Sequence, residues 1–571
     1  MTRLFVGLLA LCTCVAHSAS RAPVAAENGM VVTAQRYATN VGVDVLARGG
    51  NAIDAAIAVG YALAVVYPAA GNLGGGGFMT VQLADGRKTF IDFREVAPLA
   101  ATADMFLDAQ GNVIPNASLR GHLAVAVPGT VSGLEYVREK YATRPRADLM
   151  SAAIGLAKSG YVLEQGDVDM LREATEDFRK DPASAAIFLR GGAPLEPGAT
   201  LRQPDLARTL ERIRRHGADG FYKGETAREL VAASRAGNGI LAQADLDAYR
   251  TRELAPLECD YRGFGIVAAP PPSSGGVVLC EMLNILEGYP LAEFGHGSAR
   301  ALHVQIETMR RGYFDRNHLL GDTGFVDNPI ATLLDETYAA RVRAQIDLTR
   351  AGNSRAMQGV APPGVPPGGS HTTHYSIADR FGNAVAVTYT LNDWFGARVT
   401  AAGTGVLLNN EMDDFTSKVG VPNLYGLVQG ETNKIEPGKR PLSSMSPTIV
   451  TRDGKPWMIL GTPGGSRIIT AVMLTMLNVI DYGMDMQEAV DAPRIHQQWL
   501  PEETFVEARA MSPDTREILL RMGHKLTLPQ PENHVAAILI GAPALNTKPV
   551  GRNRFYGALD PRRETGLARG L

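Results

Sequence analysis

A stretch rich in glycine and proline divides the sequence about two-thirds of the way along the chain. Between residues 352 and 370 the composition changes, and the stretch ends Ala361-Pro-Pro-Gly-Val-Pro-Pro-Gly-Gly-Ser370. Proline fixes φ and lacks a backbone donor, so this stretch cannot be a helix or a central strand. We expect an exposed connector between two parts of the chain.

A predicted strand pair follows this connector at once. Residues 374–379 and 384–391 are rich in β-branched and aromatic side chains, and the turn Arg380-Phe-Gly-Asn383 separates them. Two threonines, Thr372 and Thr373, stand between the connector and the first strand. The order is therefore connector, threonine pair and β-hairpin.

Upstream, the pattern predicts buried helices beside a second hairpin. In residues 55–66, apolar side chains recur at helical spacing. The predicted helix is apolar on nearly all its faces, which is typical of a helix buried between two layers. Residues 78–83 and 89–93 are predicted strands around a turn at 84–86. Residues 149–249 alternate helical patterns with charged positions and carry no site signal, so we expect them on the outside.

Composition favours a globular protein that acts on a small molecule. The chain has 571 residues, of which 45% are hydrophobic, enough for a substantial core. A net charge of -3 with 20% charged residues lacks the basic surplus that nucleic acid or an anionic membrane would attract. We therefore expect no nucleic acid and no membrane partner.

The first residues have the pattern of a secretory signal. Arg3 precedes a short apolar run at residues 4–15, and small residues follow, so residues 1–20 are a predicted signal peptide of an exported, most simply periplasmic, protein. Its removal would leave two cysteines, Cys259 and Cys280. One bridge is an alternative, but Cys280 lies in an apolar helical pattern, and we expect two free thiols.

Thr372 is a candidate nucleophile if the chain is cut just before it. A threonine hydroxyl needs a base, and an N-terminal threonine supplies one in its own α-amine, with a pKa of roughly 7.7–8.0. The plain alternative is a β-branched pair in a sheet. A metal site at His371 and His374 has no third ligand nearby, so we interpret both as loop histidines.

Several longer segments resemble the signature segments of gamma-glutamyltranspeptidases, in the order of that family, and the resemblance covers nearly the whole mature chain. They are Gly71-Asn-Leu-Gly-Gly-Gly-Gly-Phe78, Asp92-Phe-Arg-Glu95, Pro270-Pro-Pro-Ser-Ser-Gly-Gly276, Thr372-Thr-His-Tyr-Ser376, Thr388-Tyr-Thr-Leu-Asn392, Leu407-Leu-Asn-Asn-Glu-Met-Asp-Asp-Phe415, Arg440-Pro-Leu-Ser-Ser-Met-Ser-Pro447 and Gly461-Thr-Pro-Gly-Gly-Ser-Arg467.

This resemblance implies an α+β fold, the four-layer αββα sandwich of N-terminal-nucleophile hydrolases. It implies autocatalytic cleavage before Thr372 into a large subunit, residues 21–371, and a small catalytic subunit, residues 372–571. The two pieces would form a heterodimer that cleaves glutathione and other gamma-glutamyl amides, with water or an amino acid or peptide as acceptor. No metal or organic cofactor is implied.

The resemblance also implies roles for individual residues. Thr372 would be the nucleophile, Thr390 would orient it, and Gly464-Gly465 would form the oxyanion hole. The remaining residues would bind the glutamyl group: Arg94, Ser443 and Ser444 its carboxylate, Asn392, Glu411 and Asp414 its ammonium, with Tyr425 as a lid. Without the resemblance, these positions are ordinary strand, turn, ion-pair and loop residues.

Two departures and three alternatives accompany this hypothesis. Glu411 stands where many bacterial relatives have glutamine, and the segment 541–556 looks long, which we expect to alter only a surface hairpin. The alternatives are a cephalosporin or glutaryl acylase of the same superfamily, a catalytically silent secreted relative, and a serine hydrolase using Ser273 or Ser274. The last lacks a Gly-x-Ser-x-Gly elbow.

Overall fold

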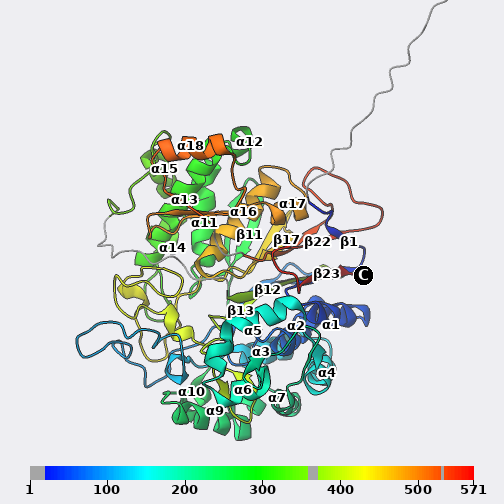
Figure 1. Ribbon diagram of the computed structural model, residues 1–571. Coiled ribbons are helices and arrows are strands. Elements are labelled where there is room, and N and C mark those ends of the chain that lie inside the picture. Colours follow the sequence, from blue (N-terminus) through cyan, green and yellow to red (C-terminus); the bar gives the residue numbers. More distant parts are fainter. Residues whose placement is uncertain (1–19, 358–370, 529–532) are drawn as a thin grey trace, which may run out of the picture.

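The computed structural model describes residues 20–357, 371–528 and 533–571. Two antiparallel seven-stranded sheets lie at the centre, with helices above and below them (Figure 1). The predicted signal peptide, apart from Ser20, and most of the predicted connector, residues 358–370, lie outside the described residues.

The first sheet contains both predicted hairpins. Strands β12 and β13 pair, as do β3 and β4, and β13 pairs with β3, so the hairpins lie side by side. Both hairpin predictions are confirmed. The strand order is β23 (Leu567–Gly570), β2 (Gly29–Thr33), β12 (Thr372–Asp379), β13 (Ala384–Thr390), β3 (Gly76–Gln82), β4 (Lys88–Phe93) and β9 (Arg252–Leu254).

The second sheet combines strands from both sides of the connector. Its order is β1 (Val24–Ala26), β22 (Phe555–Leu559), β21 (Ala536–Ile540), β17 (Lys455–Gly461), β16 (Thr448–Arg452), β11 (Phe264–Ala268) and β10 (Leu257–Tyr261). The long segment noted in the sequence joins β21 to β22 and is mostly exposed, which confirms a surface hairpin.

Helices cover the outer face of each sheet. On the first sheet lie α1 (Arg36–Ala47) and α2 (Ala52–Val66), and every residue of α2 is buried, as predicted. On the second lie α11 (Gly275–Glu287), α13 (Ala299–Leu319) and α16 (Ile468–Ile480). Small and branched side chains, such as Ala386 and Ile538, fill the space between the sheets. The expected four-layer αββα arrangement is confirmed.

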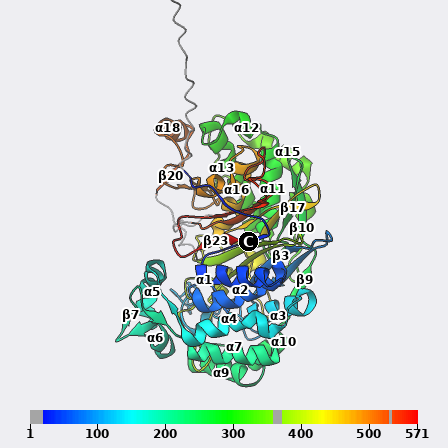
Figure 2. The ribbon, with the colours of Figure 1, turned by 90° about the vertical axis from the view of Figure 1, so that its right-hand side faces the viewer.

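The predicted outer part of the chain is a stack of helices beyond α2. Helix α4 packs on α2 and α7 packs on α4, so the tiers recede from the sheet (Figure 2). The stack comprises α4 (Arg146–Ser159), α7 (Pro204–His216), α8 (Asp219–Tyr222), α9 (Gly224–Ala236) and α10 (Gln243–Ala248). Helices α5 (Gln165–Phe178) and α6 (Pro182–Phe188) lie beside it (Figure 2). None of the described helices is long and apolar enough to cross a membrane.

Strand β12 is buried on both faces, and its residues alternate between two environments. Tyr375 points to the helices, where its hydroxyl donates to the carbonyl of Ala56 at 3.1 Å. Ser376 points to the second sheet and donates to the carbonyl of Ala536 at 2.9 Å. Because side chains alternate along a strand, Thr372 lies on the same face as Ser376, between the two sheets.

The expectation of two free thiols is wrong. Cys259 on β10 and Cys280 on α11 form a disulfide, with Cα atoms 6.1 Å apart. The sequence pattern correctly predicts that Cys280 is buried. It contains no information that α11 packs against β10. That packing brings the two side chains together.

Removing this bridge should destabilise the protein. It closes a loop with a sequence separation of 21 residues, for which chain entropy gives about 3 kcal/mol. We expect Cys259→Ala/Cys280→Ala to lower the thermal denaturation midpoint. Reductant should lower the midpoint of the wild type but not that of the variant. Peptide mapping without reductant that finds both cysteines alkylated would contradict the bridge.

Candidate active site

Thr372 begins β12 directly opposite the last residue of β13. Thr372 and Thr390 are register partners, and the Thr372 hydroxyl donates to Thr390 Oγ1 at 3.3 Å. The Thr390 hydroxyl donates in turn to the carbonyl oxygen of His371 at 3.1 Å. A chain of hydroxyls therefore joins the candidate nucleophile to the peptide bond that precedes it.

A glycine pair follows the end of β17, and one of the two glycines lines the cavity that holds Thr372. Gly464 and Gly465 have φ of +138° and +53°, a region that favours glycine. A Cβ on Gly465 would lie 2.2 Å from the Tyr425 ring, and one on Gly464 would lie 2.0 Å from Asn533 Nδ2. Only glycine fits at these two positions, and the backbone of Gly465 lines the cavity that holds Thr372.

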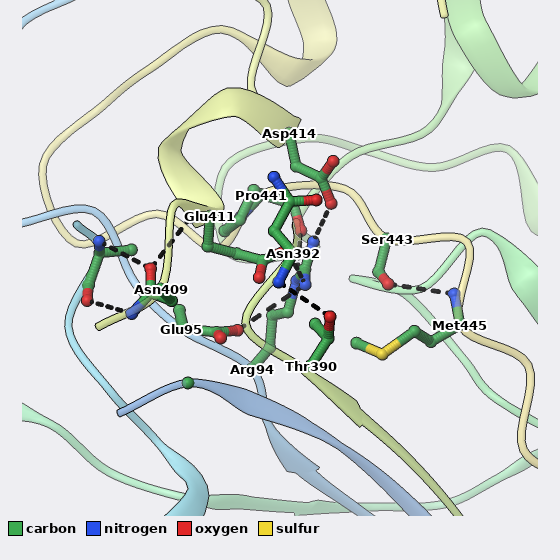
Figure 3. Close-up of polar contacts among 12 residues, drawn as sticks. Arg94, Glu95, Thr390, Asn392, Asn409, Glu411, Asp414, Pro441, Ser443 and Met445 are labelled. Carbon is green, nitrogen blue, oxygen red and sulfur yellow. Dashed lines mark hydrogen bonds and ion pairs between the residues drawn. The ribbon is translucent and has the colours of Figure 1, made fainter. Parts of the chain in front are cut away.

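Arg94 follows the end of β4 and is surrounded by carboxylates. Its guanidinium pairs with Glu411 through Nη1 and with Asp414 through Nη2, both from the short helix η2 (Glu411–Asp414). Glu95 lies 3.7 Å from Nη1 (Figure 3). The side chain of Arg94 is 1% exposed. The predicted carboxylate-binding and ammonium-binding residues are thus in direct contact.

Burial decides the protonation of this cluster. It raises the pKa of Glu411 well above the ordinary range and that of Glu95 to about 7, against the opposing effect of Arg94. Burial alone would lower the pKa of Arg94, but Glu411, Asp414 and Glu95 outweigh it and raise that pKa. Glu411 Oε2 has no partner among the described residues. A cationic ligand beside this oxygen would favour the carboxylate form of Glu411.

Ser443 and Ser444 precede β16 and are held from behind by two further serines. Ser274 donates both its N–H, at 2.8 Å, and its hydroxyl, at 2.7 Å, to the carbonyl of Ser443. The hydroxyl of Ser273 donates to the carbonyl of Met445 at 2.7 Å. Both supporting serines are fully buried. Their hydroxyls bind backbone, which argues against the serine-hydrolase alternative.

Arg316 on α13 is a site residue that the sequence did not indicate. Its Nη2 donates to Ser444 Oγ at 3.0 Å and its Nε to Ser274 Oγ at 2.9 Å. Burial lowers its pKa to about 10, so the guanidinium stays charged at neutral pH. Arg316 stands in a helix with several other charged residues, and only the packing of α13 shows which of them faces the site.

One small cavity unites the predicted residues. Its volume is about 20 Å³, room for roughly one water. Tyr425 lines it and is 4% exposed, and its hydroxyl donates to the carbonyl of Asn392 at 2.7 Å. Of the predicted site residues, all but Gly464 line this cavity: Arg94, Thr372, Thr390, Asn392, Glu411, Asp414, Tyr425, Ser443, Ser444 and Gly465.

The interpretation of His374 as a loop histidine is wrong. His374 lies within β12, and its ring nitrogens contact the hydroxyls of Thr388 at 2.8 Å and Ser376 at 3.0 Å. Burial lowers its pKa to about 3, so it is neutral. It fills the space over Gly461, where a Cβ would lie 2.3 Å from its ring. Its role is packing between the sheets.

One group in the described residues has the composition of a metal site, and it lies outside the catalytic cavity. His303, Glu307 and His524 are buried close together. The two imidazoles contact each other, with His303 Nδ1 and His524 Nε2 2.7 Å apart, and Arg310 pairs with Glu307. These contacts explain the cluster without an ion.

A second, larger cavity lies among the outer helices. Its volume is about 610 Å³, and its lining includes residues of α5, α6, α9 and the segment 397–402. The sequence carried no site signal in this region. Three of its lining residues, Arg120, Asp177 and Arg398, belong to an ion-pair network.

Comparison with known proteins identifies the family. The sequence profile of Gamma-glutamyltranspeptidase matches residues 38–569, nearly the whole chain. The chain belongs to the gamma-glutamyltranspeptidase family. With αββα layers and a candidate nucleophile at the start of a central strand, this member has the fold of N-terminal-nucleophile hydrolases.

Its relatives match it from end to end. A protein of Pseudomonas sp. strain A14 named glutathione hydrolase proenzyme is 69% identical, over 97% of this chain and 96% of the relative. A protein of the same name from Escherichia coli K12 is 46% identical, over 96% of this chain and 93% of the relative. The structure of a cephalosporin acylase from Bacillus halodurans has a TM-score of 0.83 at 28% identity, covering 98% of each chain.

The raised pKa of Glu95 predicts a pH-dependent stability. A carboxyl whose pKa rises from 4.5 unfolded to about 7 folded contributes stability that is complete below pH 4.5 and is lost as pH rises through 7. Glu95→Gln removes this dependence. Its free energy of unfolding should therefore rise relative to that of the wild type between pH 5 and 8, by up to about 3 kcal/mol, which denaturant titration at each pH measures.

Exposed Glu139 provides the matched control. Glu139→Gln removes one carboxylate from the surface and should follow the wild-type pH curve. A constant difference between Glu95→Gln and the wild type over this range would show that Glu95 does not titrate there.

Proposed function

We propose that this protein is a self-processing gamma-glutamyl hydrolase and transferase whose nucleophile is Thr372. The observation that carries the proposal is the hydroxyl chain from Thr372 through Thr390 to the His371 carbonyl, set beside a buried arginine ringed by carboxylates. Glycine backbone faces the same cavity. Family membership and relatives named glutathione hydrolase proenzyme support it.

The first reaction is cleavage of the bond between His371 and Thr372. Thr372 Oγ attacks the carbonyl carbon of His371, whose oxygen accepts the Thr390 hydroxyl. The carbon–nitrogen bond breaks, the Thr372 nitrogen takes the proton that the hydroxyl loses, and an ester remains. Water then hydrolyses the ester, leaving a carboxylate on His371 and a free amine on Thr372. The subunits would be residues 21–371 and 372–571.

The second reaction uses the amine that the first releases. The α-amine accepts the proton of Thr372 Oγ, which attacks the γ-carbonyl of glutathione. The N–H groups of Gly464 and Gly465 stabilise the oxyanion. The bond to cysteinylglycine breaks, and its amine takes the proton. Water or an acceptor amine then resolves the γ-glutamyl ester and restores Thr372.

The head group of the substrate matches the charges of the site. A γ-glutamyl group ends in a carboxylate and an ammonium. Arg94 with Ser443 and Ser444 supplies donors for the first, and Arg316 adds a cation that holds the Ser444 hydroxyl. Glu411, Asp414 and Asn392 supply acceptors for the second. About 20 Å³ is too small for this group, so we expect the cavity lining to move when the group enters, with Tyr425 as the proposed lid.

The predicted signal peptide, residues 1–20, and the disulfide between Cys259 and Cys280 both fit an exported protein. The proposed location is the periplasm.

An acylase is the second candidate, favoured by the likeness to the Bacillus halodurans cephalosporin acylase. Glutaryl substrates lack the ammonium of a γ-glutamyl group. A preference for glutaryl substrates would leave the carboxyl groups of Glu411, which is buried, and Asp414, which is partly exposed, without a ligand partner. Their presence favours the γ-glutamyl substrate.

Variants of the two threonines test the processing reaction. We expect Thr372→Ala to remain one chain, whereas the wild type yields a fragment that begins Thr-Thr-His-Tyr by N-terminal sequencing. Thr390→Ala should process about 10- to 100-fold more slowly because it loses one hydrogen bond to the reacting carbonyl. Thr390→Ser should retain it and serves as the control. A wild type that stays whole would support the silent relative instead.

Asp414→Asn separates the two substrate classes. It keeps the shape of the side chain but removes the charge proposed to face the ammonium. For γ-glutamyl-p-nitroanilide we expect kcat/KM to fall about 100-fold, with little change for glutaryl-p-nitroanilide. An equal loss for both substrates would assign Asp414 a structural role.

A further inference from the structure

The side chain of His371, the residue before the proposed cleavage point, is buried and held by small-subunit residues. His371 is 8% exposed, and its Nδ1 lies 3.2 Å from Asp393 Oδ1 and 3.3 Å from the backbone nitrogen of Trp394. Its ring stands edge-on to the Trp394 ring, with centroids 5.2 Å apart. One neighbour can accept a hydrogen bond and the other can donate one, so either tautomer of the ring is held.

Asp393 is itself fixed from several directions. Its backbone nitrogen donates to Asn410 Oδ1 at 2.9 Å, and its Oδ1 accepts the N–H of Trp394 at 2.8 Å. Its Oδ2 pairs with Arg120 at 2.7 Å and lies 3.6 Å from Arg398. Asp393 is 2% exposed, and a buried carboxylate needs such partners.

The two arginines are joined to a second carboxylate. Arg120 Nε lies 3.2 Å and Arg398 Nη1 2.9 Å from Asp177 Oδ2, at the end of α5. Arg120 and Asp177 belong to the large subunit of the proposed enzyme, and Asp393 and Arg398 to the small one. A charged network therefore crosses the future subunit boundary and ends on the residue before the cleaved bond.

Geometry is decisive for the first cut, because the α-amine of Thr372 is then part of the peptide bond and cannot serve as base. The His371 carbonyl already accepts the Thr390 hydroxyl at 3.1 Å. A loose His371 side chain would let this carbonyl rotate away from both threonines, and displacements of about 1 Å can cost 100-fold in rate. Anchoring the side chain of His371 fixes its carbonyl.

We propose that His371 and Asp393 are positioning residues for self-cleavage: the Asp393 network holds the His371 side chain so that its carbonyl faces Thr372 and Thr390. This inference rests on the proposed cleavage before Thr372. We expect His371 to take no part in turnover by the cut enzyme, because it then ends the large subunit, is no longer bonded to Thr372 and does not line the cavity.

The test follows the precursor after cell-free synthesis and measures the first-order rate at which fragments form. We expect His371→Ala and Asp393→Ala to slow processing about 10- to 100-fold. His371→Asn, which can still donate or accept a hydrogen bond, should recover much of the rate. Asp393→Asn should fall between Asp393→Ala and the wild type, because it keeps the contact to His371 and loses the charge that faces Arg120.

Three controls make the outcomes decisive. Once cut and purified, His371→Ala should hydrolyse γ-glutamyl-p-nitroanilide with kcat and KM within about twofold of wild type, which separates positioning in the precursor from damage to the mature site. Thr372→Ala/His371→Ala should match Thr372→Ala in denaturation midpoint, which excludes misfolding. Thr372→Ala alone should stay whole.

Two results would overturn the inference. One is a His371→Ala precursor that processes at the wild-type rate. The other is a His371→Ala variant whose mature enzyme loses as much kcat/KM as its precursor loses in processing rate. A wild type that never forms fragments, or a Thr372→Ala that does, would overturn the proposed function itself.

Discussion

The structure depends on the register of β12 between a helix layer and a second sheet. Tyr375 reaches the backbone of α2, and His374 occupies the space that Gly461 leaves open. Because side chains alternate, a slip of one residue would exchange these two environments and place a phenol where only an imidazole fits. Thr372 is thus aimed into the gap between the sheets by residues that take no part in its chemistry. Thr390 and Gly465 reach the same edge from β13 and β17.

The second constraint is the presence of charge in that gap. Arg94 is buried with three carboxylates, and Arg316 is buried beside two serines. Burying such groups costs more than a single ion pair returns unless the remaining hydrogen bonds are made. Arg94 also donates to the carbonyl of Pro441, and Arg316 is hydrogen-bonded by neighbouring side chains. A zwitterionic ligand carries both a positive and a negative charge. Its binding can therefore replace the ion pairs within the Arg94 cluster by ion pairs to the ligand, without leaving a buried charge unpaired.

The sequence predicted features that depend on local pattern and missed those that depend on packing. Both hairpins, the buried helix α2 and the outer helices follow from periodicity. Every site residue that the motifs predicted, except Gly464, lines one cavity. Arg316 and the disulfide were missed because α13 and α11 meet their partners only in three dimensions. His374 was misread because a polar residue beside a glycine- and proline-rich stretch resembles a loop, whereas two hydroxyls satisfy it inside the sheet interface.

In the proposed mechanism, one threonine serves two reactions with different means of activation. In the precursor its nitrogen is an amide, so the first reaction depends on how the reacting carbonyl is held. In the cut enzyme the nitrogen is an amine and supplies the base that the precursor lacked. The groups that constrain the first reaction therefore need not constrain the second. In this chain His371 and Asp393 do not line the cavity that holds Thr372 and Arg94.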